Sequence, residues 1–325
     1  MTLSIVTTLY CSAAHLEEFY RRARAAAETI TTDYEIVFVH DGSPDDSLFI
    51  ALELFERDPR VRVVDLARNF GHHKAMMTGL RHARGKLVFL IDSDLEEDPE
   101  LLTAFAATLD SAAADVDVVY GVQQERRGDW FERWSGRIFF RLFNLMSDYP
   151  IPENLLTVRL MTSRYVSALL SHGEREMAIA GLWVLTGFRQ VPIAVTKHSR
   201  SKTTYSLRRK IAVLVNSITS FSSRPLVFIF YLGVAIGALA AVAAVYLVIR
   251  RVFFGILLPG WPSLIVSVWL LGGMILACLG IVGIYLSRIF IETKQRPYTI
   301  VRSVHERTTD SAEPRDPRDG RPLLL

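Results

Sequence analysis

Two long stretches without charge near the carboxyl end constrain the fold of this chain more than any other feature. Leu226–Ile249 carries no charged residue, and Leu264–Phe290 carries only Arg288. At 1.5 Å of rise per residue, a helix of about 24 residues spans roughly 36 Å, whereas the hydrocarbon core of a bilayer is about 30 Å thick. We therefore predict two transmembrane helices, which form a hairpin over residues 225–291.

Positively charged residues flank this hairpin unevenly. Those before it are Lys202, Arg208, Arg209, Lys210 and Arg224, and those at or after its end are Arg288, Lys294, Arg296 and Arg302. The cations of the connection between the two stretches are Arg250 and Arg251. Because basic residues favour the cytoplasmic side, the asymmetry predicts a two-span protein of the cell inner (plasma) membrane with both termini in the cytoplasm. The amino terminus has no basic segment before an apolar one, so we expect no signal peptide.

The rest of the composition is that of a globular protein. Hydrophobic residues make up 50% of the 325 residues, which is high but below the content of a chain wholly embedded in lipid. The net charge of +3 is modest. Its basic residues cluster beside the predicted hairpin, so attraction to an anionic leaflet explains them better than nucleic-acid binding does. The cysteines are Cys11 and Cys278, and we expect neither a disulfide nor a thiolate metal site.

Strand-like and helix-like segments alternate through the first 120 residues or so. The expected strands are Leu3–Leu9, Glu35–His40, Val61–Leu66, Leu87–Ile91 and Val116–Tyr120. The expected helices are His15–Ile30, Ser47–Arg57, His72–Arg84 and Leu101–Leu109. Such alternation favours an α/β fold with a mostly parallel sheet and helices on both faces. We assign residues 1–204 to this domain.

Two basic, apolar segments and a polar tail complete the chain. In the segment Trp130–Met146, aromatic and aliphatic residues share one helical face and charged residues occupy the other. This pattern is typical of an amphipathic interfacial helix, or alternatively of an ordinary helix packed on the sheet. A second interfacial helix is expected over residues 205–224. The tail, 292–325, is expected to be cytoplasmic and largely disordered from about Ser303, because it has too few apolar residues to form a core.

The strand Leu87–Ile91 runs directly into Asp92-Ser93-Asp94. Open α/β sheets bind ligands at the carboxyl ends of their parallel strands. Two carboxylates delivered there suit Mg²⁺ or Mn²⁺, which takes its remaining ligands from water and from substrate phosphates. The alternative is a solvated acidic turn, since the acidic residues at 96–98 continue the negative charge.

The second strand also ends at an acidic residue, Asp41, and Gly42 after it permits a sharp turn. A carboxylate here could accept bonds from the base or ribose of a nucleotide, or it could cap the following helix. Arg68–Lys74 follows the third strand and could offer cations and backbone donors to a phosphate, although such segments more often only begin a helix. We do not expect His72 or His73 to bind a metal, because nothing nearby supplies the remaining ligands.

Several motifs, in this order, resemble the family 2 glycosyltransferases that act on polyprenyl phosphates. They are Tyr34–Ser43, Arg68–His72, Ala83–Gly85, Asp92–Leu95, Asp98–Glu100, Val119–Val122, Ile218–Ser222, Pro259–Trp261 and Ile284–Ile289. The resemblance implies a GT-A (Rossmann-like) catalytic domain on two spans and inversion at the anomeric carbon. It also implies a nucleotide-sugar donor, with UDP as the expected nucleotide, and undecaprenyl phosphate as the acceptor.

The resemblance further implies roles for individual residues. The nucleotide-binding residues would be Thr8, Tyr10, Asp41 and Asp92, and the metal-diphosphate pair would be Asp92 and Asp94. The catalytic residues would be Asp92, Asp94 and Arg126. Apart from the resemblance, Arg126 and Arg127 precede the first amphipathic segment, and Arg200 and Lys202 precede the second, so these cations could hold the acceptor phosphate or, alternatively, attract lipid head groups. The chain also departs from the family pattern. Gln123 stands where an arginine is usual, His40 where an aspartate is usual, and Thr157 where many members carry the aspartate proposed as their base.

The absence of that aspartate bears on the acceptor. A phosphate monoester has a second pKa near 6, so it is already an anionic nucleophile at neutral pH, and we predict transfer of one sugar to a polyprenyl phosphate. A hydroxyl of a lipid-linked or capsular glycan would need a base, for which Glu153 and His198 are the candidates. A membrane partner that binds a nucleotide sugar or lipid without turnover is a third hypothesis, which the intact metal pair disfavours. Small residues at Gly272, Gly273 and Gly280 would allow close approach of helices in a homo-oligomer.

Overall fold

The computed structural model describes residues 1–123, 154–175, 179–198, 222–254 and 260–307. Its described strands form one sheet in the order β7-β5-β6-β4-β1-β2-β3-β8. Four strands make its parallel half: β1 (Leu3–Leu9), β2 (Tyr34–His40), β3 (Val61–Leu66) and β4 (Leu87–Leu90). The others are β5 (Val116–Gln123), β6 (Leu155–Thr162), β7 (Arg189–Val195) and β8 (Val301–His305).

The parallel pairing predicted from the alternating pattern is confirmed. β1 pairs in parallel with both β2 and β4, and β2 pairs in parallel with β3. Every residue of these first three strands is buried, which agrees with their nearly continuous apolar runs. Beyond β4 the sheet becomes mixed, because β6 is antiparallel to both β4 and β5 while β7 is parallel to β5.

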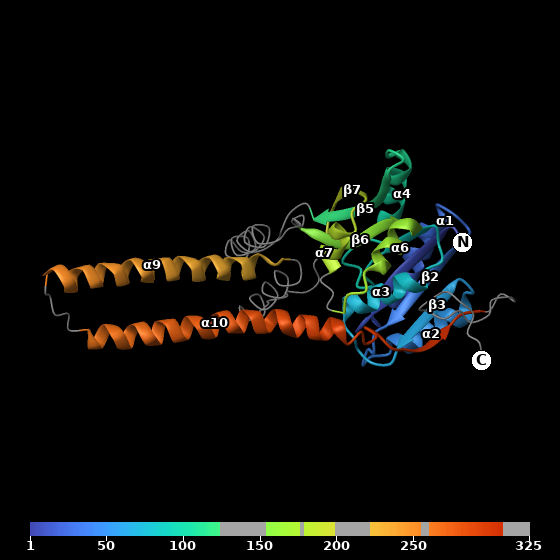
Figure 1. Ribbon diagram of the computed structural model, residues 1–325. Coiled ribbons are helices and arrows are strands. Elements are labelled where there is room, and N and C mark those ends of the chain that lie inside the picture. The colour runs from blue at the N-terminus through green and yellow to red at the C-terminus, as the bar shows by residue number, and fades with distance from the viewer. Residues whose placement is uncertain (124–153, 176–178, 199–221, 255–259, 308–325) are drawn as a thin grey trace, which may run out of the picture.

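Helices cover both faces of the sheet (Figure 1). On one face lie α1 (Leu16–Glu28), α2 (Ser47–Arg57) and α4 (Leu101–Ser111). On the other lie α3 (His72–His82), α6 (Ser163–Ser171) and α7 (Ile179–Leu185). The bounds of α2 are those expected, whereas α1, α3 and α4 differ from the expected bounds by one or two residues at their ends, where fraying makes boundaries least defined. The sequence did not predict α6 or α7.

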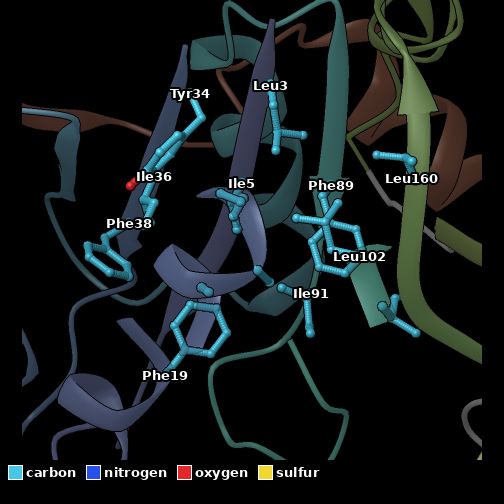
Figure 2. Packing of buried hydrophobic residues seen from close by; sticks show 14 of the residues in the cluster. Leu3, Ile5, Phe19, Tyr34, Ile36, Phe38, Phe89, Ile91, Leu102 and Leu160 are labelled. Atoms are coloured by element: carbon cyan, nitrogen blue, oxygen red, sulfur yellow. The ribbon is translucent and has the colours of Figure 1, made fainter. Parts of the chain in front are cut away.

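The core under α1, α2 and α4 is built from alternate residues of the central strands. Figure 2 shows Ile5 and Phe89 of neighbouring strands in this layer, with Phe19 of α1 packed toward them. The ring centroids of Phe19 and Phe38 lie 6.4 Å apart, and those of Phe89 and Phe105 lie 6.1 Å apart, both edge to face. Burial of each such side chain contributes about 1.5–3 kcal/mol, so this layer fixes the strand ends that carry the polar residues described below.

The two apolar stretches form long helices, α9 (Arg224–Phe254) and α10 (Trp261–Thr293), which lie side by side and extend away from the sheet (Figure 1). Arg224–Ala243 and Ser267–Thr293 are long and apolar enough to span a membrane. Large apolar side chains such as Phe228, Trp269 and Leu276 are exposed along them. At Gly272, Gly273 and Gly280 an added Cβ would have no contact within 4 Å, so these glycines are not needed for packing between α9 and α10. The close approach of helices from a second copy at these positions stays a prediction.

The prediction that the tail is disordered from about Ser303 is wrong for residues 303–307. The chain returns from α10 to the sheet, where β8 pairs antiparallel with the edge strand β3. Arg302 contacts Asp65 at 3.1 Å, and Glu306 contacts Arg62 at 2.5 Å. The composition argument considered only apolar burial, whereas backbone pairing and ion pairs hold this strand. Residues 308–325 lie outside the described part.

Other predicted features also fall outside the described residues. The amphipathic segment Trp130–Met146 lies wholly within 124–153, and most of the second interfacial helix lies within 199–221. The boundary proposed at residues 204 and 205 lies in the second of these gaps. These assignments therefore stay predictions.

Candidate active site

A cavity of about 390 Å³ opens at the carboxyl ends of β1, β2 and β4, and we call it the strand-end cavity. Its walls are formed by Thr8, Tyr10, Ser12, Asp41, Asn69, Gly71, His72, Asp92, Ser93 and Asp94. The residues predicted to bind the nucleotide and the metal are thus brought to one place. They meet because parallel strands present their carboxyl ends at the same edge of the sheet.

Asp92 and Asp94 follow β4 in a turn whose next residue, Leu95, has a positive φ of 58°. The Asp94 carboxylate accepts a 2.9 Å hydrogen bond from the backbone N–H of Glu96. Burial raises the pKa of Asp94, and the nearby charge of Asp92 adds to the rise. The turn therefore holds two carboxylates together at the cost of electrostatic repulsion, which a bound cation would relieve.

His72, the first residue of α3, lies between two predicted site residues. Its Nδ1 is 3.0 Å from Oγ1 of Thr8, and its Nε2 is 3.3 Å from a carboxylate oxygen of Asp92. Burial lowers the pKa of His72, but the carboxylates of Asp92, Asp41 and Asp94 outweigh it, so the net shift is upward. The sequence pointed to this segment as a phosphate contact but gave no reason to single out His72 as a partner of Asp92.

Asp41 has a structural task at the end of β2. Its carboxylate accepts backbone hydrogen bonds from Phe70 at 2.7 Å and Gly71 at 3.0 Å, so it holds the loop that leads into α3. Burial raises the pKa of Asp41 despite these two bonds. Because the carboxylate also lines the strand-end cavity, its predicted contact with a base or ribose stays a prediction.

The glycine after Asp41 is required by a close approach of two loops. Gly42 has a φ of 58°, as the sharp turn predicted from the sequence requires. A Cβ at this position would lie 2.4 Å from the backbone N of Asn69 and 2.5 Å from the carbonyl carbon of Arg68. A larger residue would therefore push apart the two loops that form one wall of the cavity.

His40, which stands where relatives of this type usually carry an aspartate, is part of a buried hydrogen-bond chain. Its Nε2 accepts from the backbone N–H of Ser43 at 3.0 Å, so Nδ1 carries the proton that it donates to Asp65 at 2.7 Å. Arg302 of the returning tail also donates to Asp65, at 3.1 Å. His40 thus ties the loop after β2 to Asp65 of the neighbouring strand β3.

The alternative interpretation of residues 96–98 as a solvated acidic turn is wrong for Glu97. Its side chain is 1% exposed, neither carboxylate oxygen has a hydrogen-bond partner among the described residues, and Lys197 Nζ lies 3.7 Å away. Burial, with Asp92 next in importance, raises the pKa of Glu97 to about 8. Lys197 also pairs with Glu96 at 3.0 Å, so the loop after β7 is fastened to this turn.

The donor set fits a hard divalent cation held jointly with a substrate. Among the described residues no group of three or more acidic, His or Cys side chains is arranged to hold a metal alone. Mg²⁺ is commonly bound by one or two carboxylates and completed by water and phosphate oxygens, which is what Asp92 and Asp94 at an open cavity could provide.

The predicted acceptor-phosphate residues cannot be placed in this arrangement. Arg126, Arg127, Arg200, Lys202 and Glu153 all lie outside the described residues. Two neighbouring positions are described. Thr157 lies in β6, and Nε2 of His198 is 3.2 Å from a carboxylate oxygen of Asp98. His198 is not among the residues that line the strand-end cavity, so its position gives no support to a role as base there.

Comparison with known proteins agrees with the geometry. The family model described as Glycosyl transferase family 2 matches residues 4–169. A Mycobacterium tuberculosis protein named as a glycosyltransferase is 57% identical over 314 residues, covering 97% of this chain and 91% of its own. The bactoprenol glucosyl transferase of Shigella phage SfX is 30% identical, covering 93% of this chain and 99% of its own.

Among solved structures, that of Staphylococcus aureus TarS residues 1–349 with UDP-GlcNAc is similar, with 20% identity and a TM-score of 0.45. The match covers 68% of this chain and 66% of that one. The family match spans the parallel strands, both acidic strand ends and β6, on a mostly parallel GT-A-like sheet. The chain therefore belongs to glycosyl transferase family 2.

Proposed function

We propose that this glycosyltransferase moves one sugar, with inversion, from a nucleotide-diphosphate sugar to a polyprenyl phosphate at the cytoplasmic face of the membrane. The donor is a UDP-hexose. The observation that carries the proposal is the strand-end cavity, in which Asp92 and Asp94 lie with Thr8, Tyr10 and Asp41. The relatives named bactoprenol glucosyl transferase support a lipid-phosphate acceptor.

The residues of the strand-end cavity divide into two groups. Asp41 holds the loop 69–71 and lines the cavity, which supports it as the residue that binds the nucleoside. Asp92 and Asp94 would hold Mg²⁺ or Mn²⁺. Such an ion, when bound, supplies charge stabilisation to the departing nucleoside diphosphate. His72, at the start of α3 beside Asp92, adds a donor on the same wall.

The choice of a phosphate acceptor is supported by the absence of a carboxylate base at position 157 of β6. Thr157 cannot take a proton from a nucleophile, so a hydroxyl acceptor would have no base at this position. A phosphate monoester carries its negative charge at neutral pH and needs only to be positioned near the anomeric carbon. Inversion then follows from a single displacement by that oxygen.

The membrane location rests on α9 and α10. Their exposed apolar side chains would be unfavourable in water along the whole of both helices, whereas lipid would cover them. The basic residues that flank the hairpin favour a cytoplasmic position for the domain. A lipid acceptor would then be available at the surface beside the catalytic domain.

The test is product analysis. Purified full-length protein is incubated with a panel of nucleotide sugars, a polyprenyl phosphate and Mg²⁺ or Mn²⁺, and the lipid product is identified by mass. We expect one donor, a UDP sugar, to give a polyprenyl phosphate that has gained one hexose. Transfer only to a lipid-linked glycan hydroxyl, or tight donor binding without any product, would overturn the proposal.

A further inference from the structure

A second cavity, of about 250 Å³, lies in the other half of the sheet, between β5, β6 and α7. We call it the Arg159 cavity. Its walls are formed by Tyr120, Leu155, Arg159, Trp183, Val184, Phe188 and Gln190. Three of these side chains are purely apolar, whereas Arg159, Trp183, Tyr120 and Gln190 carry hydrogen-bond donors. The amide of Gln190 already donates to the carbonyl oxygens of Trp183 and Gly187.

Arg159 is buried without a neutralising partner. Its side chain is 0% exposed, and no carboxylate pairs with it among the residues that the structure describes. Nε donates to the carbonyl oxygen of Thr157 at 3.2 Å and Nη2 to that of Leu156 at 3.3 Å, but Nη1 has no acceptor within the described part of the chain. Burial lowers the pKa of Arg159 to about 9, so the guanidinium still carries its charge at neutral pH.

A second buried donor on the same wall is also unsatisfied. The guanidinium carbon of Arg159 lies 3.0 Å from the ring centroid of Trp183, so the two side chains are stacked. Trp183 is 3% exposed, and its indole Nε1 has no hydrogen-bond partner in the described part of the chain. Buried donors normally have a hydrogen-bond partner. Here Nη1 of Arg159, which is charged, and Nε1 of Trp183, which is neutral, both lack one beside the same cavity. This indicates that the cavity binds a ligand with anionic acceptor atoms.

The position of the Arg159 cavity relates it to the strand-end cavity. Arg159 lies opposite Leu90 in the β4–β6 ladder, two residues before Asp92. In Figure 1, α7 lies toward the end of the domain from which α9 and α10 extend. The cavity is therefore in the part of the domain that lies nearer the two long helices.

The apolar part of the wall narrows the chemistry further. Leu155, Val184 and Phe188 would contact hydrocarbon, whereas the guanidinium and the indole N–H would contact anionic oxygens. We propose that the Arg159 cavity is a binding site for a phosphate monoester that carries an apolar chain. That this phosphate monoester is also the acceptor of the sugar rests on the proposed function; the binding site itself does not.

Binding can be measured without turnover. Full-length protein in detergent is titrated calorimetrically with citronellyl phosphate, with inorganic phosphate and with citronellol, in the absence of any sugar donor. We expect citronellyl phosphate to bind tightest, because only this probe offers both the anion and the chain. Equal affinity for citronellol or for inorganic phosphate would overturn the assignment of a chain-bearing phosphate.

Two variants connect this binding to the two donors. We expect Arg159→Met, which keeps the side chain long but removes its charge, to weaken citronellyl phosphate at least about 10-fold. Trp183→Phe keeps an aromatic ring and removes the indole N–H, and we expect it to weaken binding about 3-fold to 10-fold. Arg21→Met, an exposed cation of α1 paired with Glu18, is the matched control and should change nothing.

UDP binding serves as the test of folding for each variant, because the strand-end cavity is separate. Unchanged citronellyl phosphate affinity in both Arg159→Met and Trp183→Phe would overturn the proposal. The outcomes for the two proposals differ. If the wild-type protein binds citronellyl phosphate through Arg159 but transfers no sugar to any prenyl phosphate, the proposed function fails and the site stands. If sugar transfer to a prenyl phosphate occurs but Arg159→Met leaves the affinity for citronellyl phosphate unchanged, the proposed site is wrong and the proposed function stands.

Discussion

The two cavities of the catalytic domain differ in the sign of the charge that they hold. The strand-end cavity gathers carboxylates, and burial raises the pKa of both Asp41 and Asp94 there. Among the described residues, the Arg159 cavity is lined by one guanidinium, whose pKa burial lowers. Both shifts reflect charge that is poorly compensated by the protein itself, and each would be relieved by a ligand of opposite sign.

The difference arises from strand direction. In the parallel half, β1, β2 and β4 deliver residues just beyond their carboxyl ends, where loops and solvent meet. In the other half, β6 runs in the opposite direction, so Arg159 lies within a ladder between β4 and β5. One sheet therefore presents an open cavity lined by carboxylates and a second cavity lined by a buried guanidinium. The two proposals assign the first to a metal-bound diphosphate and the second to an anionic acceptor.

The largest expected effect is in the strand-end cavity. Asp94→Asn removes one of two carboxylates that would hold the metal, and a metal ion contributes several kcal/mol to such a reaction, so we expect transfer to fall at least about 100-fold. Initial rates at saturating donor measure this. Asp110→Asn, an exposed carboxylate on α4, is the control. Full turnover in the Asp92→Asn, Asp94→Asn double variant would show that the carboxylates have no such role.

The second prediction separates the cavities kinetically. Arg159→Met should raise KM for the lipid phosphate at least about 10-fold, because a charge-assisted contact is lost, and leave KM for the nucleotide sugar within about twofold. Steady-state kinetics with each substrate varied in turn give both values. A comparable rise in both KM values would contradict the division into two independent sites.

Asp41→Asn sharpens the account of the strand-end cavity. The amide keeps one acceptor oxygen, so the backbone N–H of either Phe70 or Gly71 loses its partner, which costs about 1.5–3 kcal/mol for bonds to a charged group. We expect a lower Tm and a KM for the nucleotide sugar that rises about 10-fold, because the loop 69–71 lines the cavity. An unchanged Tm would show that these bonds do not hold the loop.

Glu97 provides a pH test on the acidic side of the comparison. Burial raises the pKa of Glu97 to about 8, so the folded protein keeps a proton that the unfolded carboxyl releases near pH 4.5. Stability is therefore lost as pH rises from about 4.5 to 8. We expect Glu97→Gln to match the wild type near pH 5 and to have a Tm at least about 5 °C higher at pH 8.5, in metal-free buffer. A difference that is constant with pH would contradict this.

The smallest effect is expected at the far edge of the sheet, where β8 joins β3. Burial raises the pKa of Glu306, but Arg62 and Arg84 outweigh it and lower the pKa overall. A lowered pKa stabilises above about pH 4.5 and the stabilisation is lost as pH falls through the lowered value. Glu306→Gln should therefore cost about 1 kcal/mol, or about 2–4 °C in Tm, at pH 7.

That difference should disappear toward pH 3, because the wild-type carboxyl is then protonated. Glu56→Gln, on the exposed side of α2, is the matched control and should show no such pH dependence. If Glu306→Gln leaves Tm unchanged at pH 7, the ion pairs of the returning tail do not contribute to stability.

Local patterns in the sequence were sufficient for much of this fold. The predicted bounds of β1, α2 and β3 agree with the structure, because alternation and helical periodicity are properties of a few neighbouring residues. The gathering of Asp41, Asp92 and Asp94 also followed, since the carboxyl ends of parallel strands must meet at one edge. The family resemblance supplied the expected chemistry of those residues.

Other features depend on contacts between distant segments, which no local pattern encodes. Arg159 is buried against Trp183 from another element, Glu97 is enclosed beside Lys197, and His72 reaches Asp92 across two strand ends. β8 pairs with β3 although Arg302 follows Asp65 by 237 residues. The sequence by itself determined the five strands of the first 123 residues and, to within a few residues, where they end, but not β6, β7 or β8. Only the tertiary structure decided which charges lost their water and which partners they found, because desolvation depends on everything packed around a group.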